Sequence, residues 1–232
     1  MSGFLSVIMG QMERSTAGSA ETAAKVLQMC SGKAEKILFF GDDIITPQLI
    51  EKETGARVLA TFGEEARAEA ATKAGLDARQ VGAYELAATD GGWDMIWYNG
   101  LTEPDGIAGR LEQIKNSLAA GGVAVYRTLC WLIDPSPDTK GYVEHRFGKP
   151  VHLDEVLRLA KESGFAVEDF YIAPRSDWKQ NFYEPISELV KAHESTDEDA
   201  AAGVGEINRE IYMFDLHSEE YSFVYYVLRS RS

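Results

Sequence analysis

Apolar residues follow two alternating spacings along most of this chain. Short runs rich in apolar residues, typical of strands in a covered sheet, occupy residues 36–40, 56–61, 93–98, 123–127 and 165–172. Between these runs, apolar residues recur every three or four positions, as on one face of a helix, in segments 20–30, 64–74, 107–118 and 153–160. Strands that alternate with helices of this length predict an α/β fold with a mostly parallel sheet covered on both faces.

Local signals predict where some helices begin and end. Thr46 and Pro47 suit the N-cap and the first helical position of one helix, which Gly55 ends. The Gly121-Gly122 pair breaks a later helix before the strand that follows it. Ligands of such sheets bind outside the carboxyl ends of the strands. Those ends are expected near Gly41, Phe62, Ala83, Asn99 and Arg127.

The pattern changes after Ala173. Residues 174–220 combine aromatic residues with two amphipathic helices, and the run at 221–228 is rich in Tyr, Phe and Val, which predicts a strand. We therefore expect one domain over residues 1–232, made of a helical segment (1–34), an α/β core (35–173), an insertion (174–220) and a last strand (221–228).

The chain is strongly acidic, with 23 Lys and Arg against 37 Asp and Glu and a net charge of −14. Because phosphate binding depends on clustered Lys and Arg, this balance disfavours nucleic acids and anionic membranes as partners. No apolar run is long enough for a membrane span and no signal peptide is recognisable, so we expect a cytoplasmic protein. Cys30 and Cys130 have no metal-ligand spacing, which predicts two reduced thiols and no metal site.

Six stretches carry a resemblance to a known family. They read GSAETAAKVL (18–27), KILFFGDD (36–43), DMIWYNG (94–100), LAAGGVAVYRTLCWLIDPSP (118–137), SDWKQNFYEPI (176–186) and YSFVYYVLR (221–229). In this order they resemble class I S-adenosylmethionine (SAM) methyltransferases of the ubiquinone-biosynthesis type, over nearly the whole chain. The resemblance implies a Rossmann-like, seven-stranded sheet whose antiparallel last strand is 221–228. It also implies a lid at the Trp-rich segment, and methyl transfer from SAM to a small organic acceptor.

The same resemblance implies a SAM-binding turn after the first strand, with an acidic residue followed by three glycines at alternate positions. Here Phe39 takes the place of the acid, and only Gly41 matches a glycine, because Asp43 and Ile45 occupy the other two positions. Asp42 and Asp43 are two acids that either face the cationic groups of SAM or cap the following helix.

Three further cofactor positions depart from the family pattern. Phe62 occupies the position of the carboxylate that binds the ribose, Ala83 that of the acid near the adenine, and Asn99 that of a glutamate after the fourth strand. Each lost charge-assisted hydrogen bond costs about 1.5–3 kcal/mol. We therefore expect SAM to bind weakly, and no catalytic residue is assigned.

An acceptor site is implied under the lid, where Trp178 and Tyr183 are expected over the carboxyl ends of the strands. Its candidate residues are Tyr98, Trp131, His145, Trp178, Asn181 and Tyr183. Aromatic side chains with a few polar groups suit a small-molecule ligand, and the alternative is a lid that packs on its own core.

Two functions from different classes follow. The chain is either a SAM-dependent methyltransferase or an inactive, methyltransferase-like binding module. The second class includes a homodimer and the partner subunit of an active relative. A different ligand in the old SAM cleft is a third option.

Overall fold

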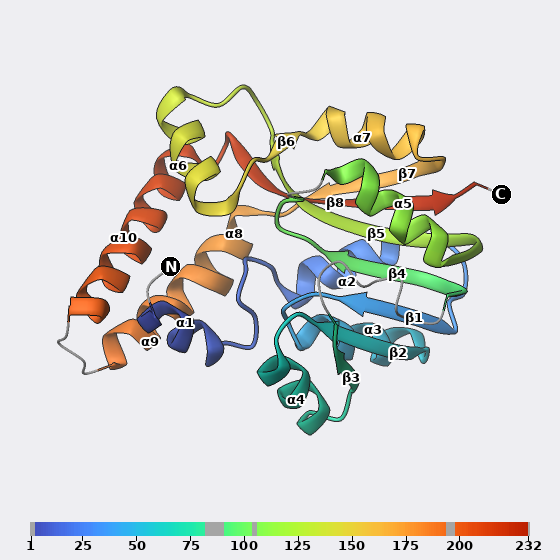
Figure 1. The fold of residues 1–232 in the computed structure, drawn as a ribbon, viewed down its shortest axis with the longest axis horizontal. Helices are drawn as coiled ribbons and strands as arrows, with labels where there is room; N and C mark the ends of the chain where they lie inside the picture. Colours follow the sequence, from blue (N-terminus) through green and yellow to red (C-terminus); the bar gives the residue numbers. More distant parts are fainter. Residues whose placement is uncertain (1–2, 82–90, 104–105, 194–197, 232) are drawn as a thin grey trace.

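The fold is built around one eight-stranded sheet (Figure 1). A computed structural model describes residues 3–81, 91–103, 106–193 and 198–231. The strand order is β3-β2-β1-β4-β5-β8-β7, with β6 paired to β5 beside this path. The strands are β1 (Lys36–Phe40), β2 (Arg57–Phe62), β3 (Asp77–Gln80), β4 (Trp93–Asn99), β5 (Leu118–Trp131), β6 (Val151–His152), β7 (Phe165–Ile172) and β8 (Tyr221–Ser230).

The strand directions confirm the predicted α/β, Rossmann-like fold. The described sheet has eight strands rather than the expected seven, because the short β6 also pairs with β5. Strands β1 to β5 pair in parallel, whereas β8 lies antiparallel between β5 and β7. The predicted last strand at 221–228 is therefore inside the sheet, and it continues to Ser230.

Helices cover both faces of this sheet. Figure 1 shows α5 (Ile107–Ser117) and α7 (Leu153–Glu162) in front, and α2 (Ala20–Met29) and α3 (Ile45–Thr54) behind. The helix α4 (Glu65–Lys73) packs beside β3. No helix in the described part of the chain is long and apolar enough to cross a membrane.

A helical part lies at the carboxyl ends of the parallel strands, on the left of Figure 1. It combines helices from both ends of the chain, since α1 packs against α9 and α10. Its elements are α1 (Gly3–Gly10), α6 (Pro137–Phe147), α8 (Arg175–Trp178), the π-helix η2 (Lys179–Tyr183), α9 (Glu184–Ala192) and α10 (Glu198–His217).

The alternation of side chains along each strand divides the core in two. Phe39 and Trp97 are register partners on one face, and Phe40 and Tyr98 are register partners on the other. On the second face the rings of Phe40, Tyr98 and Tyr126 stack in a row, with centroid separations of 5.0 and 5.6 Å. The order of apolar residues within each strand therefore decides which side chains pack on the face covered by α2 and α3 and which pack under α5 and α7.

Two predicted helix boundaries are wrong. The helix α3 begins at Ile45, so Thr46 is not its N-cap; instead Thr46 donates its backbone N–H to Asp43 Oδ1 at 2.6 Å. The helix α5 ends at Ser117, and β5 starts at Leu118 and continues through Gly121-Gly122. A Cβ at Gly122 would lie 3.0 Å from two backbone oxygens, so the strand needs glycine there for close backbone approach.

A buried ion pair joins α6 to α10. Arg146 Nε lies 2.7 Å from Glu210 Oε2, and the Tyr183 hydroxyl donates to Glu210 Oε1 at 3.3 Å. Burial raises the pKa of Glu210, and Arg146 and the Tyr183 hydroxyl oppose this rise only in part. The carboxyl of Glu210 therefore holds its proton more tightly in the folded chain than in the unfolded chain.

This raised pKa predicts a pH dependence of stability. The stabilisation due to proton binding at Glu210 is complete below the ordinary glutamate pKa of about 4.3 and is lost as pH rises through the folded value. The free energy of unfolding of the wild type should therefore fall, relative to Glu210→Gln, as pH rises from about 4 to 7. Urea titrations at each pH measure the difference, and a difference that stays constant would contradict the prediction.

Candidate functional site at the carboxyl ends of the strands

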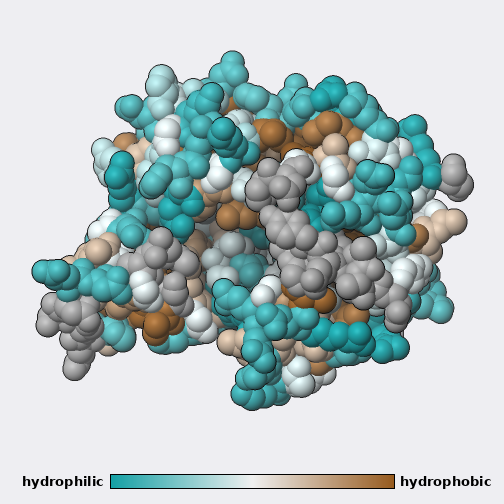
Figure 2. Space-filling model, in the orientation of Figure 1, coloured by the Kyte–Doolittle hydropathy of each residue, from teal (hydrophilic) through white to brown (hydrophobic). Residues whose placement is uncertain are grey.

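A cleft of about 260 Å³ lies where the resemblance implies a SAM site. Its walls come from the turn after β1, the ends of β2 and β4, and residues 15–16 near the N-terminus. Figure 2 shows this face of the molecule hollowed between the helical part and the sheet. The cleft is smaller than small-molecule sites usually are, which hold roughly 300–1,000 Å³.

The turn after β1 packs against the side chain of Phe39. The ring of Phe39 is fully buried and lies 6.2 Å from the ring of Phe62. A Cβ at Gly41 would come within 2.6 Å of the Phe39 ring and 3.1 Å of Asn99 Cβ. The contacts of Phe39 and Asn99 alone therefore require a glycine at position 41, without any ligand.

Asp43 is buried, and its carboxylate already accepts hydrogen bonds from other residues of this chain. Its side chain receives the N–H of Thr46 at 2.6 Å and Nδ2 of Asn99 at 3.1 Å, and Oδ1 lies 3.6 Å from Nη2 of Arg14. Asn99 is held in turn, because Trp97 Nε1 donates to its Oδ1 at 2.9 Å. Asp43 therefore caps α3 and pairs with a buried arginine.

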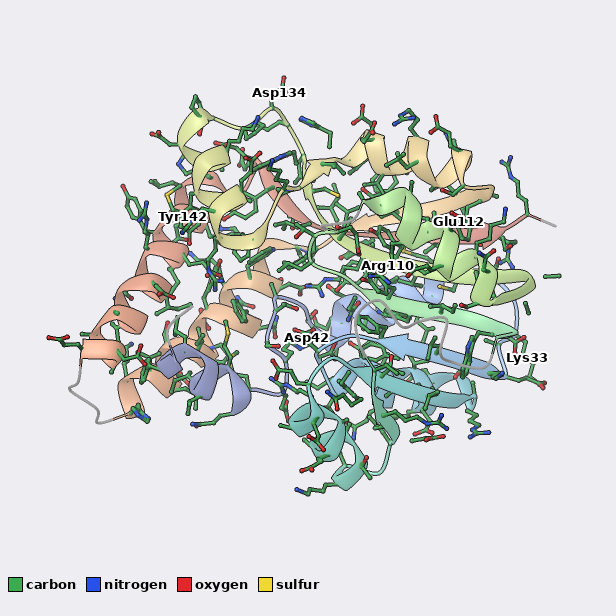
Figure 3. All side chains as sticks on the ribbon, in the orientation of Figure 1. Lys33, Asp42, Arg110, Glu112, Asp134 and Tyr142 are labelled. Atoms are coloured by element: carbon green, nitrogen blue, oxygen red, sulfur yellow. The ribbon has the colours of Figure 1, made fainter. Side chains whose placement is uncertain are left out.

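Asp42 faces the N-terminal segment from the end of β1 (Figure 3). The hydroxyl of Ser15 donates to its Oδ2 at 2.8 Å, and the hydroxyl of Thr16 donates to Oδ1 at 3.4 Å. Both acids of the turn thus bind residues 12–17, which we call the N-terminal strap.

Two buried arginines and one backbone bond hold the strap over the turn. Arg127 Nη2 donates to Thr16 Oγ1 and to Ala17 O, both at 3.0 Å. Arg67 donates to the carbonyl oxygens of Met9, at 2.8 Å, and Met12. The N–H of Ile44 donates to Glu13 O at 3.2 Å. The strap is therefore bonded on both sides of the cleft.

Sequence reasoning missed Arg14 and the strap entirely. Arg14 stands in a polar stretch with no periodic signal, and its partner Asp43 lies in another element. Arg127, in contrast, is expected from the sequence as the residue at the carboxyl end of a strand. In the structure the guanidinium of Arg127 lies 3.6 Å from the centroid of the Phe223 ring.

Asp177 is a buried acid beside Arg14 and Arg127. Burial raises the pKa of its carboxyl, and contacts from Ser19, Thr22 and the two arginines oppose this rise.

The remaining cofactor candidates differ in burial. Phe62 is fully buried at the end of β2, while Glu64 and Glu65, at the start of α4, are exposed. Ala83 lies outside the described residues. Two described carboxylates, Asp42 and Glu64, line the cleft, whereas the buried Asp43 is bonded to Thr46 and Asn99.

The six acceptor candidates do not share one pocket. Trp131, Trp178 and Tyr183 are at most 3% exposed and belong to one aromatic cluster, which joins the end of β5 to the helical part. Tyr98 lies on the opposite sheet face, where the Arg110 guanidinium covers its ring at 5.0 Å. His145 is exposed on α6, and Asn181 is exposed on η2. Trp178 lies against β8 beside the end of β5, but it is buried rather than facing the cleft.

Comparisons with known proteins agree with this topology. No family model and no curated protein sequence matches the chain. A SAM-dependent methyltransferase from Thiobacillus denitrificans, in complex with S-adenosyl-L-homocysteine, is 15% identical with a TM-score of 0.79 and covers 100% of this chain and 99% of its own. Another from Geobacter sulfurreducens, in the same complex, is 13% identical with a TM-score of 0.78 and covers 100% and 99%.

A third similar structure is named for different chemistry. The [4+2]-cyclase SpnF is 14% identical with a TM-score of 0.69, and the match covers 91% of this chain and 80% of SpnF. The chain therefore has the Rossmann-like fold of class I SAM-dependent methyltransferases. At these identities the likeness concerns the fold.

Proposed function

We propose that this chain is a methyltransferase-like protein that does not use SAM, and that it acts as a small-molecule binding module or as the partner subunit of an active relative. One observation carries the proposal. The groups of the turn that should meet the cofactor are bonded within the chain, Asp43 to Arg14 and Asn99, and Asp42 to Ser15.

The energetic argument concerns what SAM would have to displace. The cationic groups of SAM would compete with Arg14 and with two hydroxyl donors of the strap for Asp42 and Asp43. The ribose would meet the ring of Phe62 instead of a carboxylate. Two or three lost charge-assisted hydrogen bonds, each worth about 1.5–3 kcal/mol, weaken binding by at least roughly a hundredfold.

Methyl transfer from SAM to a small organic acceptor is the second candidate. The strand order and the two similar methyltransferases in complex with S-adenosyl-L-homocysteine favour it. The two proposals differ in one measurable quantity, the affinity of the wild-type protein for SAM.

We expect the wild-type protein to bind SAM with a dissociation constant on the order of a millimolar or weaker. Isothermal titration measures this directly, and S-adenosylhomocysteine is the matched ligand that lacks the transferable methyl group. A ligand at 100 times its dissociation constant would add about 2.7 kcal/mol to the free energy of unfolding. Micromolar binding of either ligand would restore the methyltransferase as the first candidate.

A gain-of-binding variant tests the same explanation in the other direction. The change Asp43→Gly, Ile45→Gly and Phe62→Asp restores two glycines and the ribose carboxylate, so SAM affinity should rise. The free energy of unfolding should fall strongly for two reasons: Asp43 is the partner of the buried Arg14, and Phe62→Asp places a carboxylate at a fully buried position. Affinity is therefore measured only under conditions where circular dichroism shows the variant to be folded.

A further inference from the structure

A second and larger cavity lies on the other side of the N-terminal strap. It holds about 630 Å³, within the usual range for a small-molecule site. Its walls are residues 11–14, the first residues of α2 and α3, and the segment formed by η2 and α9. Residues 11–14 line this cavity and residues 15–16 line the smaller cleft, so the strap separates the two.

One wall of this cavity carries a buried cation. Arg14 is 7% exposed and lines the cavity, and its Nη2, which is enclosed on the side of Asp43, has no hydrogen-bond acceptor among the described residues. The nearest carboxylate oxygen, on Asp43, lies at 3.6 Å, which is longer than a hydrogen bond. A Cβ at Gly18 would come within 2.6 Å of Arg14 Nη1, so the glycine leaves room for the guanidinium. The adjacent N-terminus of α2 is already capped within the chain, because the Ser19 hydroxyl accepts the N–H of Thr22 and the Asp177 carboxyl contacts both residues.

The rest of the lining supplies the opposite charge and an apolar surface. Glu13 and Glu188 are exposed carboxylates on the cavity wall. Met12, Ile45 and Leu189 provide apolar contacts between the charged groups. A cation, two carboxylates and an apolar surface in one cavity match a ligand that carries both charges on an apolar body.

We propose that this cavity binds a small zwitterion with an apolar body, of the α-amino-acid class. The ligand carboxylate meets the Arg14 guanidinium, the ammonium meets Glu13 and Glu188, and the body packs on Met12, Ile45 and Leu189. The proposal rests on the proposed function in one respect, that the chain works as a binding module. It places the ligand outside the former cofactor cleft.

Three probes that differ by one charged group each test the assignment. L-norleucine carries both charges, hexanoate is the same molecule without the ammonium, and n-pentylamine is the same molecule without the carboxylate. A charge-assisted hydrogen bond is worth about 1.5–3 kcal/mol, so each single-charge probe should bind at least about tenfold more weakly than norleucine. Titration calorimetry on the full-length protein measures all three.

Two variants and one control locate the site. Leu189→Trp fills the cavity and should abolish norleucine binding, and Glu188→Gln should weaken norleucine but leave hexanoate unchanged. Glu184→Gln removes a carboxylate one turn earlier on α9, outside the cavity, and should change neither. Hexanoate binding as tight as norleucine, no norleucine binding at about 50 mM, or norleucine binding unaffected by Leu189→Trp would each overturn the proposal.

Failure here is distinguishable from failure of the proposed function. SAM also carries an α-amino-acid end, so it is titrated into both the wild type and Leu189→Trp. A SAM signal that survives Leu189→Trp comes from the cleft and contradicts the proposed function, whatever norleucine does. A norleucine signal that Leu189→Trp abolishes supports the zwitterion site in either case.

Discussion

Replacing Trp178 by alanine is expected to lower the free energy of unfolding by about 3–5 kcal/mol. The side chain is 1% exposed and stacks between Phe223, at a centroid distance of 5.0 Å, and Phe214, at 5.1 Å. Its Nε1 donates to Ser222 Oγ at 3.3 Å. The change would leave a cavity where α8, α10 and β8 meet, and the rigid rings around it would fill that cavity only in part. Urea unfolding followed by circular dichroism gives the value.

Tyr212 provides the matched control for this experiment. It is also aromatic and lies on α10, but it is 62% exposed, so Tyr212→Ala should stay within about 0.5 kcal/mol of the wild type. A cost below about 1.5 kcal/mol for Trp178→Ala would show that the ring is not a packed core residue. That result would return Trp178 to the acceptor-pocket hypothesis.

Much of the sheet could be predicted because its signals are local. The apolar run at 36–40 and the aromatic run at 221–228 each form the strand that their composition indicates. The helix at 153–160 places Val156 and Ala160 in the core at the expected spacing. In these segments, local propensity and the global fold agree.

The aromatic residues of the lid show the limit of composition as evidence. The sequence places Trp178 and Tyr183 beside each other in a Trp-rich segment, and both a pocket lining and a packed core fit that pattern. The direction of each ring depends on Phe214 and Phe223, which come from α10 and β8. Tertiary packing therefore decides between the two alternatives, and it favours the packed core.

The candidate cleft was predictable only in part, because its bonds join distant residues. The departure from the glycine pattern at Asp43 and Ile45 is visible in the sequence. The donors that bind the two acids cannot be recognised in the sequence, because Ser15 and Asp42 are 27 positions apart and Asn99 and Asp43 are 56 positions apart. No spacing rule connects a strap residue to a strand-end residue at such separations.

The largest expected effect at the cleft concerns Asp43. Asp43→Ala should lower the free energy of unfolding by about 3–5 kcal/mol, because it leaves the buried guanidinium of Arg14 without its carboxylate and α3 without its cap. Asp42→Ala removes a half-buried acid bonded to two hydroxyls and should cost only about 1 kcal/mol. Guanidinium chloride unfolding of both variants makes the comparison within one turn.

A double-mutant cycle decides whether the loss at Asp43 comes from Arg14. Arg14→Met removes the cation and keeps an apolar side chain in its place. In that background Asp43→Ala should cost less than in the wild type, with a coupling energy of about 1–3 kcal/mol. Additive losses would mean that Asp43 acts only through Thr46 and Asn99, and that its ion pair with Arg14 contributes nothing to holding the strap over the cleft. A positive coupling assigns to Asp43 a structural role that competes directly with cofactor binding, which is the physical basis for expecting weak SAM affinity.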